Sequence, residues 1–109
     1  MGLKNVNRNS GFISLDNICY FPMTAPDGET VYDPHKPTFC AELPISGSEF
    51  MNAGMLDIRA NVSLAIDSES DMTDELTVQY EGKVYAIYRR YLMGNGLTQL
   101  YLSEKAGVS

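Results

Sequence analysis

The chain has 109 residues, of which 44% are hydrophobic and 20% are charged, and this composition is typical of one small folded domain. Its net charge of -6 argues against a protein that binds nucleic acid tightly, because phosphate binding depends on Lys and Arg. It does not argue against a surface past which DNA slides, because such a surface repels phosphate. No apolar run approaches the roughly 18 residues of a membrane span, and the N-terminus lacks the apolar core of a signal peptide, so we expect a cytosolic protein without a membrane partner.

The first 15 residues are polar and rich in Asn, and their apolar residues are scattered rather than periodic. They predict a flexible N-terminal arm, residues 1–15, followed by a single β domain over residues 16–109. Basic and apolar side chains give this arm the means to dock on a partner, although a frayed terminus would look the same. The possible docking residues are Lys4, Arg8, Phe12 and Ile13.

Three short strands are predicted in the first half of the domain, over residues 17–23, 29–32 and 38–45. Turns that contain Pro or Gly, at 24–28 and 33–37, separate them. The third strand is expected to turn its alternate apolar residues to one face, namely Phe39, Ala41, Leu43 and Ile45.

The two cysteines, Cys19 and Cys40, lie on predicted strands and lack the spacing of a metal site. A disulfide between them stays open from the sequence, but a reducing cytosol favours buried free thiols. We therefore expect two buried thiols that hold no metal.

Residues 46–49, Ser-Gly-Ser-Glu, have the Ser-x-x-Glu form of a capping box and predict a short helix that ends at Gly54. A helix of about two turns is well below the ~12 to 15 residues needed for marginal stability in water. We therefore expect this helix to form only against a partner surface.

The longest alternation in the sequence runs from Leu56 to Ile66 and predicts a strand with one wet face that crosses a small barrel or sandwich. Polar residues that include Arg59, Asn61 and Ser63 occupy the face expected to meet water. The apolar face comprises Leu56, Ile58, Ala60, Val62, Leu64 and Ile66.

An acidic loop follows this strand, with five carboxylates and no basic residue: Asp67, Glu69, Asp71, Asp74 and Glu75. The first three fill alternate positions of an EF-hand loop. However, Met72 stands where that loop needs Gly, and Val78 stands where it needs a bidentate Glu. The pattern favours a solvated loop over a calcium site.

A three-stranded antiparallel meander is predicted from Glu75 to Leu102. A two-residue turn at Glu81-Gly82 sets Val78 opposite Tyr85 and Leu76 opposite Ile87, with these apolar residues on one face. The second hairpin turns within residues 94–96, Gly-Asn-Gly, and we expect a two-residue tip at either Gly-Asn or Asn-Gly. The fold class is therefore all-β, a small antiparallel β-barrel or sandwich.

Motifs of catalysis are missing from the sequence. It has no Gly-x-x-x-x-Gly-Lys phosphate loop, no Gly-x-Gly-x-x-Gly, no Gly-x-Ser-x-Gly and no His-Glu-x-x-His. The one histidine, His35, sits on a loop between two prolines, where an exposed spacer is the common role. We expect no catalytic, cofactor-binding or metal-binding residues.

The order of elements resembles a known family. It is a strand, a polar turn, a strand that ends in E-L-P-I-S-G (42–47), an insert, a long strand, the acidic loop and then D-E-L-T-V-Q-Y-E-G-K-V-Y-A-I (74–87) before a final hairpin. Over about Asn17 to Glu104 the chain resembles the small head-tail joining proteins of tailed bacteriophages, also called head closure or head completion proteins. The weight of this resemblance lies in order, spacing and length.

The resemblance implies a structural protein and not an enzyme. Its subunits would form a ring, expected to be a dodecamer, beneath the portal and adaptor proteins in the virion neck, after synthesis in the host cytoplasm. The ring would seal the filled head, meet the genome DNA only sterically in its channel, and dock the tail terminator or tail-tube protein.

In such relatives the insert lies near the channel axis, so residues 46–55 are the expected closure and interface segment, with the acidic loop as the next candidate. Its apolar side chains would be buried against the next subunit. The candidate residues are Ser46, Gly47, Ser48, Glu49, Phe50, Met51, Asn52 and Met55.

Two alternatives remain open from the sequence. Within the phage class, the chain could be a tail terminator or another neck-ring protein. From a different class, it could be a small cytosolic ligand-binding β-barrel whose pocket is lined by tyrosines such as Tyr80, Tyr85 and Tyr101.

Overall fold

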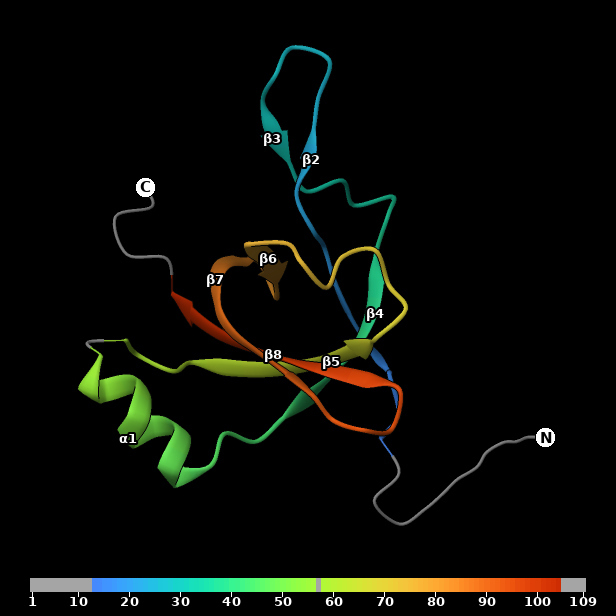
Figure 1. Cartoon of the computed structure of the whole chain (residues 1–109). Helices are drawn as coiled ribbons and strands as arrows, with labels where there is room; N and C mark the ends of the chain where they lie inside the picture. The colour runs from blue at the N-terminus through green and yellow to red at the C-terminus, as the bar shows by residue number, and fades with distance from the viewer. Residues whose placement is uncertain (1–12, 57, 105–109) are drawn as a thin grey trace, which may run out of the picture.

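The computed structural model describes residues 13–56 and 58–104 and contains one helix among short strands. Figure 1 shows these elements from β1 in blue to β8 in red. In chain order they are β1 (Asn17–Cys19), β2 (Met23–Thr24), β3 (Thr30–Val31), β4 (Thr38–Leu43), α1 (Gly47–Met55), β5 (Val62–Asp67), β6 (Thr77–Tyr80), β7 (Lys83–Leu92) and β8 (Leu97–Glu104).

Six strands form one antiparallel sheet in the order β1-β4-β5-β8-β7-β6. The two edges of the sheet meet where Tyr20, directly after β1, pairs with Gln79 of β6 through backbone hydrogen bonds of 2.9 and 2.7 Å. The sheet therefore curves into a nearly closed barrel (Figure 1). The all-β class is confirmed, and of the two expected architectures the chain adopts the barrel.

Alternate side chains of the strands fill the interior of the barrel, as the period of a half-buried strand requires. Cys19 and Cys40 are among them as unbridged thiols without exposed surface, as the sequence predicts. The buried cluster comprises Cys19, Phe21, Cys40, Leu64, Ile66, Val78, Tyr80, Tyr85, Ile87, Leu100 and Leu102.

The first hairpin of the meander has the predicted register, with Val78 opposite Tyr85. The amide of Ile87 also donates to the carbonyl of Leu76 at 2.9 Å, so the expected pairing continues one step before β6. The Leu76 side chain, however, is exposed, because the chain leaves the sheet at this point for the acidic loop. The prediction that Leu76 lies on the buried face is wrong.

The second hairpin differs from both predicted registers by one residue. Leu92 pairs with Thr98, and residues 94–96 form a three-residue turn in which Gly94 and Gly96 both have positive φ, of 83° and 85°. The two-residue tip is therefore wrong, because both glycines adopt the left-handed conformation at once. Farther along the hairpin, a β-bulge at Tyr88 shifts the pairing back by one residue.

Strand β5 begins at Val62, later than the alternation from Leu56 predicts. Leu56 instead caps the C-terminus of α1 and is exposed. The expected wet face is wrong at Ser63, which is fully buried beside Gln99 of β8 and α1, whereas Arg59 and Asp67 are exposed as expected. The helix covers a sheet face that the sequence pattern assigns to water.

Strand β4 turns Cys40 into the barrel and Phe39 outward, because Cys40 joins Cys19 in the interior. Phe39 is opposite Ile18 of β1, and both side chains are exposed. Phe39, Ala41 and Leu43 occupy alternate positions of β4, as predicted; of these, Ala41 is buried and Phe39 is exposed.

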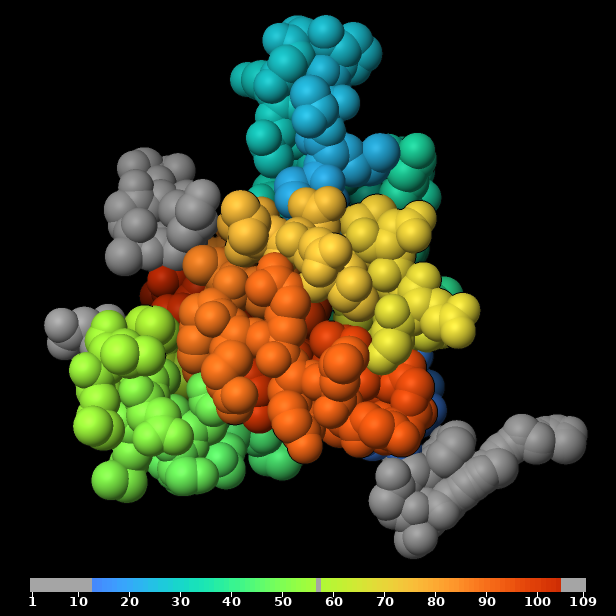
Figure 2. Space-filling model, in the orientation of Figure 1, coloured from blue at the N-terminus to red at the C-terminus, as the bar shows by residue number. Residues whose placement is uncertain are grey.

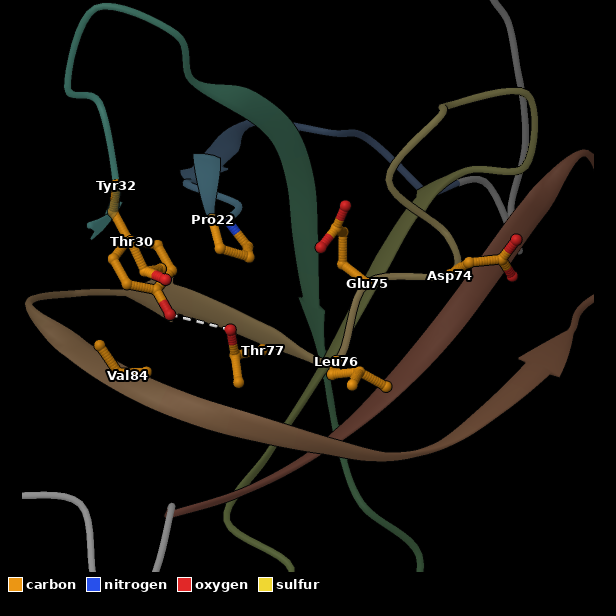
Figure 3. A pocket seen from close by; sticks show the side chains of 8 residues that line it. All are labelled: Pro22, Thr30, Tyr32, Asp74, Glu75, Leu76, Thr77 and Val84. Atoms are coloured by element: carbon orange, nitrogen blue, oxygen red, sulfur yellow. Dashed lines mark hydrogen bonds between the residues drawn. The ribbon is translucent and has the colours of Figure 1, made fainter. Parts of the chain in front are cut away.

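The β2–β3 hairpin matches the predicted turn and short return strand, with Met23 opposite Val31. It projects from one end of the barrel (Figures 1 and 2). Its base is tied to β6 by a 2.8 Å hydrogen bond between the hydroxyl groups of Tyr32 and Thr77 (Figure 3). The described part of the chain contains no helix that could cross a membrane.

Candidate assembly surface

Helix α1 begins at the capping box that the sequence predicts. The Ser46 hydroxyl oxygen accepts a hydrogen bond of 3.1 Å from the amide of Glu49, as an N-cap residue does. The helix continues through Gly54 to Met55, because the Leu56 amide still finds the carbonyl of Ala53 at 3.0 Å. The expected end at Gly54 is therefore one residue too early.

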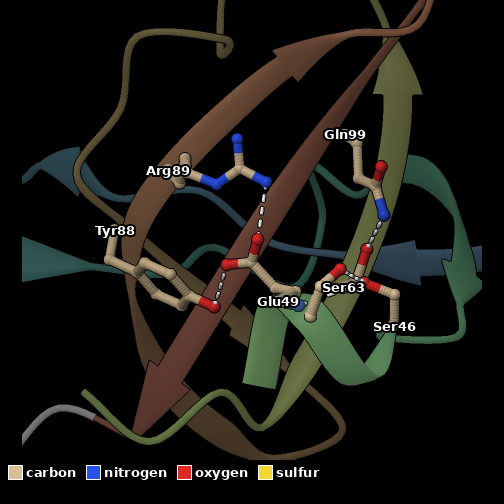
Figure 4. A network of polar contacts seen from close by, with 7 residues as sticks. Ser46, Glu49, Ser63, Tyr88, Arg89 and Gln99 are labelled. Carbon is tan, nitrogen blue, oxygen red and sulfur yellow. Dashed lines mark hydrogen bonds and ion pairs between the residues drawn. The ribbon is translucent and has the colours of Figure 1, made fainter. Parts of the chain in front are cut away.

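The carboxylate of Glu49 turns toward the barrel and not back to the helix cap. Only 5% of Glu49 is exposed. The Tyr88 hydroxyl donates to its Oε2 at 2.8 Å, and Nη2 of Arg89 donates to its Oε1 at 2.6 Å (Figure 4). One buried acidic side chain therefore attaches α1 to β7.

The β-bulge explains how two neighbouring residues of one strand reach the same carboxylate. In a regular strand, Tyr88 and Arg89 would point to opposite faces of the sheet. The shift in register between Ile87 and Arg89 breaks this alternation, so both side chains reach Glu49 on the outer side of the barrel. The bulge thus builds the attachment site of the helix.

The electrostatics of this contact favour one protonation state. Burial opposes the charge of Glu49, but hydrogen bonds from Arg89 and Tyr88, with the guanidinium charge, outweigh it and lower the pKa of this carboxyl group below its usual value. Burial, followed by the hydrogen bond to Glu49, raises the pKa of Tyr88. At neutral pH, Glu49 is ionised, Tyr88 is neutral and Arg89 is charged.

Aromatic and polar side chains extend this contact under the helix. The Arg89 guanidinium lies 4.5 Å from the centre of the Tyr101 ring, and the Tyr88 and Tyr101 rings are 6.2 Å apart. Beside them, Nε2 of Gln99 donates to the Ser63 hydroxyl at 2.5 Å. With both carboxylate oxygens occupied and its pKa lowered, Glu49 is a weak base, so the arrangement suits attachment of a helix better than proton transfer.

A pocket of about 280 Å³ lies between α1 and the Tyr88 and Arg89 side chains of β7. Its wall combines one ion pair with aliphatic carbon and contains no cysteine, serine or histidine that would act as a nucleophile or base. The lining residues are Glu49, Asn52, Ala53, Leu56, Ile58, Tyr88 and Arg89.

The outer side of α1 carries an apolar surface, which we call the helix face: Phe50, Met51 and Met55. Their exposed fractions are 52%, 71% and 81%. Ala53, by contrast, is buried and lines the pocket. The helix is therefore packed on its own chain on one side, which differs from the expectation that it needs a partner to form. The apolar residues suggested for an interface remain uncovered on the other side.

The predicted closure segment thus divides into two parts. Ser46, Gly47, Ser48 and Asn52 are exposed along with the apolar residues, whereas Glu49 points inward. Leu56 follows the helix as its C-cap and lines the pocket, although its apolar side chain also fits the alternation after it.

The acidic loop is held by a cation that its own sequence lacks. Arg90 of β7 donates from Nε to the carbonyl of Thr73 at 2.5 Å and from Nη2 to the carbonyl of Glu75. Within the loop, the Glu69 amide donates to Oδ1 of Asp67 at 2.9 Å. Asp67, Glu69, Asp71 and Asp74 are exposed, and Glu75 is half-buried. Within residues 13–56 and 58–104, no three His, Cys, Asp or Glu side chains cluster as metal ligands.

The remaining candidates are the arm residues and the tyrosines. Lys4, Arg8 and Phe12 fall outside the described residues, and Ile13 is half-buried at the start of the described chain. The tyrosines suggested for a ligand pocket do not share a face. Tyr80 and Tyr85 belong to the barrel interior, whereas Tyr101 lies on the outer side under Arg89.

Tyr80 is also hydrogen-bonded within the chain, since its hydroxyl donates to Oε1 of Glu42 at 2.8 Å.

Compared with known proteins, the chain matches no family model and no curated protein.

Proposed function

We propose that this chain is a head closure subunit, a structural ring protein in the neck of a tailed bacteriophage that retains packaged DNA and presents a docking surface to the tail. Support comes from the order and spacing of the elements from about Asn17 to Glu104, together with a small barrel and one attached helix. The proposed partners are further copies of the chain, the portal and adaptor proteins, and a tail terminator or tail-tube protein.

The observation that carries this proposal is a pair of different apolar surfaces on opposite sides of one barrel. Helix α1, which carries the helix face, lies on the left in Figure 1, and Ile18 and Phe39, which we call the β1–β4 face, belong to strands on the right. A head-to-tail ring needs two unlike surfaces of this kind, because each subunit gives one surface to the neighbour before it and the other to the neighbour after it.

We assign the closure role within the ring to residues 46–55. Glu49 fixes the position of α1, so its exposed apolar side chains keep a defined place relative to the barrel. The segment contains no Lys or Arg. Its contact with DNA is therefore steric, since nothing in it neutralises phosphate.

Surface variants test the ring without disturbing the barrel. Substitutions on the outer side of α1 leave Glu49 and its contacts with Tyr88 and Arg89 in place. Met51→Gln with Met55→Gln alters the helix face, and Phe39→Gln alters the β1–β4 face. Leu92→Gln is the matched control, because Leu92 is 74% exposed and lies on neither face.

Each face variant should fold normally and fail to support tail-bearing, DNA-filled particles in complementation, whereas Leu92→Gln should support them. A mixture of the two face variants is the sharper test. Each retains one intact face, so pairs can form through the two intact faces, but every second contact in a ring stays broken. Normal particle yield from either face variant alone would refute the assembly role of that face.

Localisation tests the phage assignment itself. Gold-labelled antibody against this chain should mark the junction between head and tail of intact particles. Label at the far end of the tail, or a protein that remains free after particles are purified, would remove the neck assignment, whatever the outcome with the face variants.

A further inference from the structure

A second surface lies at the other end of the molecule, where the β2–β3 hairpin meets the end of the acidic loop. It is a groove of about 500 Å³ (Figure 3). Its lining combines apolar and acidic side chains and contains no basic one. The lining residues are Pro22, Thr30, Tyr32, Asp74, Glu75, Leu76, Thr77 and Val84.

The acidic wall of this groove is held in place before anything binds. Arg90 is hydrogen-bonded to the backbone carbonyls of Thr73 and Glu75, on either side of Asp74. In Figure 3 the Glu75 carboxylate points toward the side of the groove where Pro22 lies. Leu76, next in the chain, is 73% exposed. Two carboxylates on a backbone that Arg90 holds, beside an uncovered leucine, suit a segment that carries both cations and apolar groups.

The chain itself contains such a segment. Residues 1–12 include Lys4 and Arg8 and no acidic residue, whereas the other 97 residues carry six basic and 14 acidic ones. In an extended backbone, Lys4, Val6 and Arg8 share one side, with the two cations about 13 Å apart. An extended arm therefore offers two positive charges around one apolar side chain.

The position of the groove favours the arm of another copy. The described chain enters β1 at its end remote from the β2–β3 hairpin (Figure 1), and its first residue, Ile13, lies nine positions before Pro22 of the groove. At about 3.3 Å per residue, an arm that turns back along β1 needs a similar number of residues to return. Lys4 would then only just reach the groove, and Arg8 would lie about halfway between Ile13 and the groove. A neighbouring chain has no such restriction.

We propose that this groove binds residues 1–12 of a second copy of the chain, with Lys4 and Arg8 paired to Asp74 and Glu75 and an apolar arm residue packed on Leu76. This contact uses neither the helix face nor the β1–β4 face. It therefore stands independently of the ring proposed above, and the two can fail separately.

A peptide titration tests the contact. The probe is a synthetic peptide of residues 1–12 with a fluorophore at its C-terminal end. The receptor is the full chain with Lys4→Glu and Arg8→Glu, so that its own arm does not compete. Binding should saturate in fluorescence anisotropy and shift the NMR signals of Leu76 and Val84. Absence of saturable binding, or shifts confined to other parts of the barrel, would overturn the proposal.

Charge variants with a matched control locate the site. In the same receptor, Asp74→Asn with Glu75→Gln should weaken binding by about 3- to 10-fold, as expected for two partly exposed ion pairs. Glu69→Gln with Asp71→Asn removes the same charge from the same loop outside the groove and should change binding less than about 2-fold. Equal weakening by the two double variants would mean general attraction to an acidic protein and would overturn the site.

Dilution distinguishes a second copy from the chain's own arm. The difference in the NMR shifts of Leu76 and Val84 between the unaltered chain and the chain with Lys4→Glu and Arg8→Glu should decrease as the protein is diluted. Shifts that persist unchanged over a 100-fold dilution would mean that the arm occupies its own groove, and the inference of a second copy would fall.

Discussion

The contact between Glu49 and β7 predicts that one carboxylate controls how firmly α1 is attached to the barrel. Glu49→Gln keeps the size of the side chain and removes its charge. The amide retains one oxygen that can accept from Tyr88 or Arg89, but its NH₂ group meets donors where the carboxylate offered a second acceptor. The variant should therefore lose about one charge-assisted hydrogen bond and leave a donor unpaired.

The size of the effect follows from the exposure of the partners. A hydrogen bond to a charged group contributes about 1.5 to 3 kcal/mol. The Arg89 side chain is 48% exposed, so water replaces part of what it loses and the lower end of that range applies. We expect the free energy of docking α1 to fall by about 1.5 kcal/mol, which makes the undocked helix about tenfold more populated.

Hydrogen exchange separates this local effect from general destabilisation. Amides of α1 that are buried near Ala53 should exchange about tenfold faster in the variant, while amides in β8 such as that of Leu100 should change only with global stability. Glu69→Gln, the same chemical change in the acidic loop, should leave α1 unchanged. Unaltered protection of α1 in Glu49→Gln would refute the role assigned to this contact.

The effect should also depend on pH with a definite sign. Because the folded-state pKa of Glu49 lies below its usual value of 4.5, the contribution of this residue is complete above that value. It is lost as the pH falls through the lower, folded-state pKa. The difference in unfolding free energy between the unaltered chain and Glu49→Gln should thus be constant near neutral pH and shrink in acid, as denaturant titrations would measure.

Four further outcomes are expected. Gly54→Ala should raise the free energy of unfolding by about 0.5 to 1 kcal/mol in denaturant titrations, because Gly54 is exposed within α1 and an added Cβ meets nothing within 4 Å; a loss of stability would contradict the helical assignment. Gly96→Ala should lower that free energy by about 1 to 2 kcal/mol, since φ is 85° there, and no change would argue against the three-residue turn. The Cys19 and Cys40 thiols should react with iodoacetamide only after unfolding, because hydrogen bonding to Cys40 and burial raise the pKa of Cys19; rapid alkylation of the folded chain, seen by mass spectrometry, would count against this. Gel shift assays at physiological salt should detect no useful affinity for duplex DNA, and tight binding that weakens steeply with salt would contradict a passive channel wall.

Local patterns predicted the parts of this fold whose partners are close in the chain. The register of Val78 with Tyr85 follows from a two-residue turn, and the cap of α1 follows from Ser46 and Glu49. The register after Gly94 did not follow, because the sequence Gly-Asn-Gly permits turns of two or three residues and the choice depends on the strands around it.

The candidate site was harder to predict because its contacts join distant residues. Glu49 looked like a capping residue, yet its side-chain partners Tyr88 and Arg89 lie 39 and 40 positions away. Nothing near Tyr88 in the sequence signals a bulge, and Ser63 looks like a water-facing residue until α1 covers it. Tertiary contacts, and not propensity, decided these positions.

The place of β8 in the sheet also has a consequence for how the chain folds. β8 pairs with β5 on one side and with β7 on the other, although it is the last of the described strands to be synthesised. Before it emerges, β1, β4 and β5 can form one small sheet and β6 and β7 another, each with an open edge. The two halves can meet at Tyr20 and Gln79, but the gap between β5 and β7 closes only when β8 joins them, so we expect folding in one late cooperative step. Chains interrupted before Leu97 should expose the edge of β5 and aggregate.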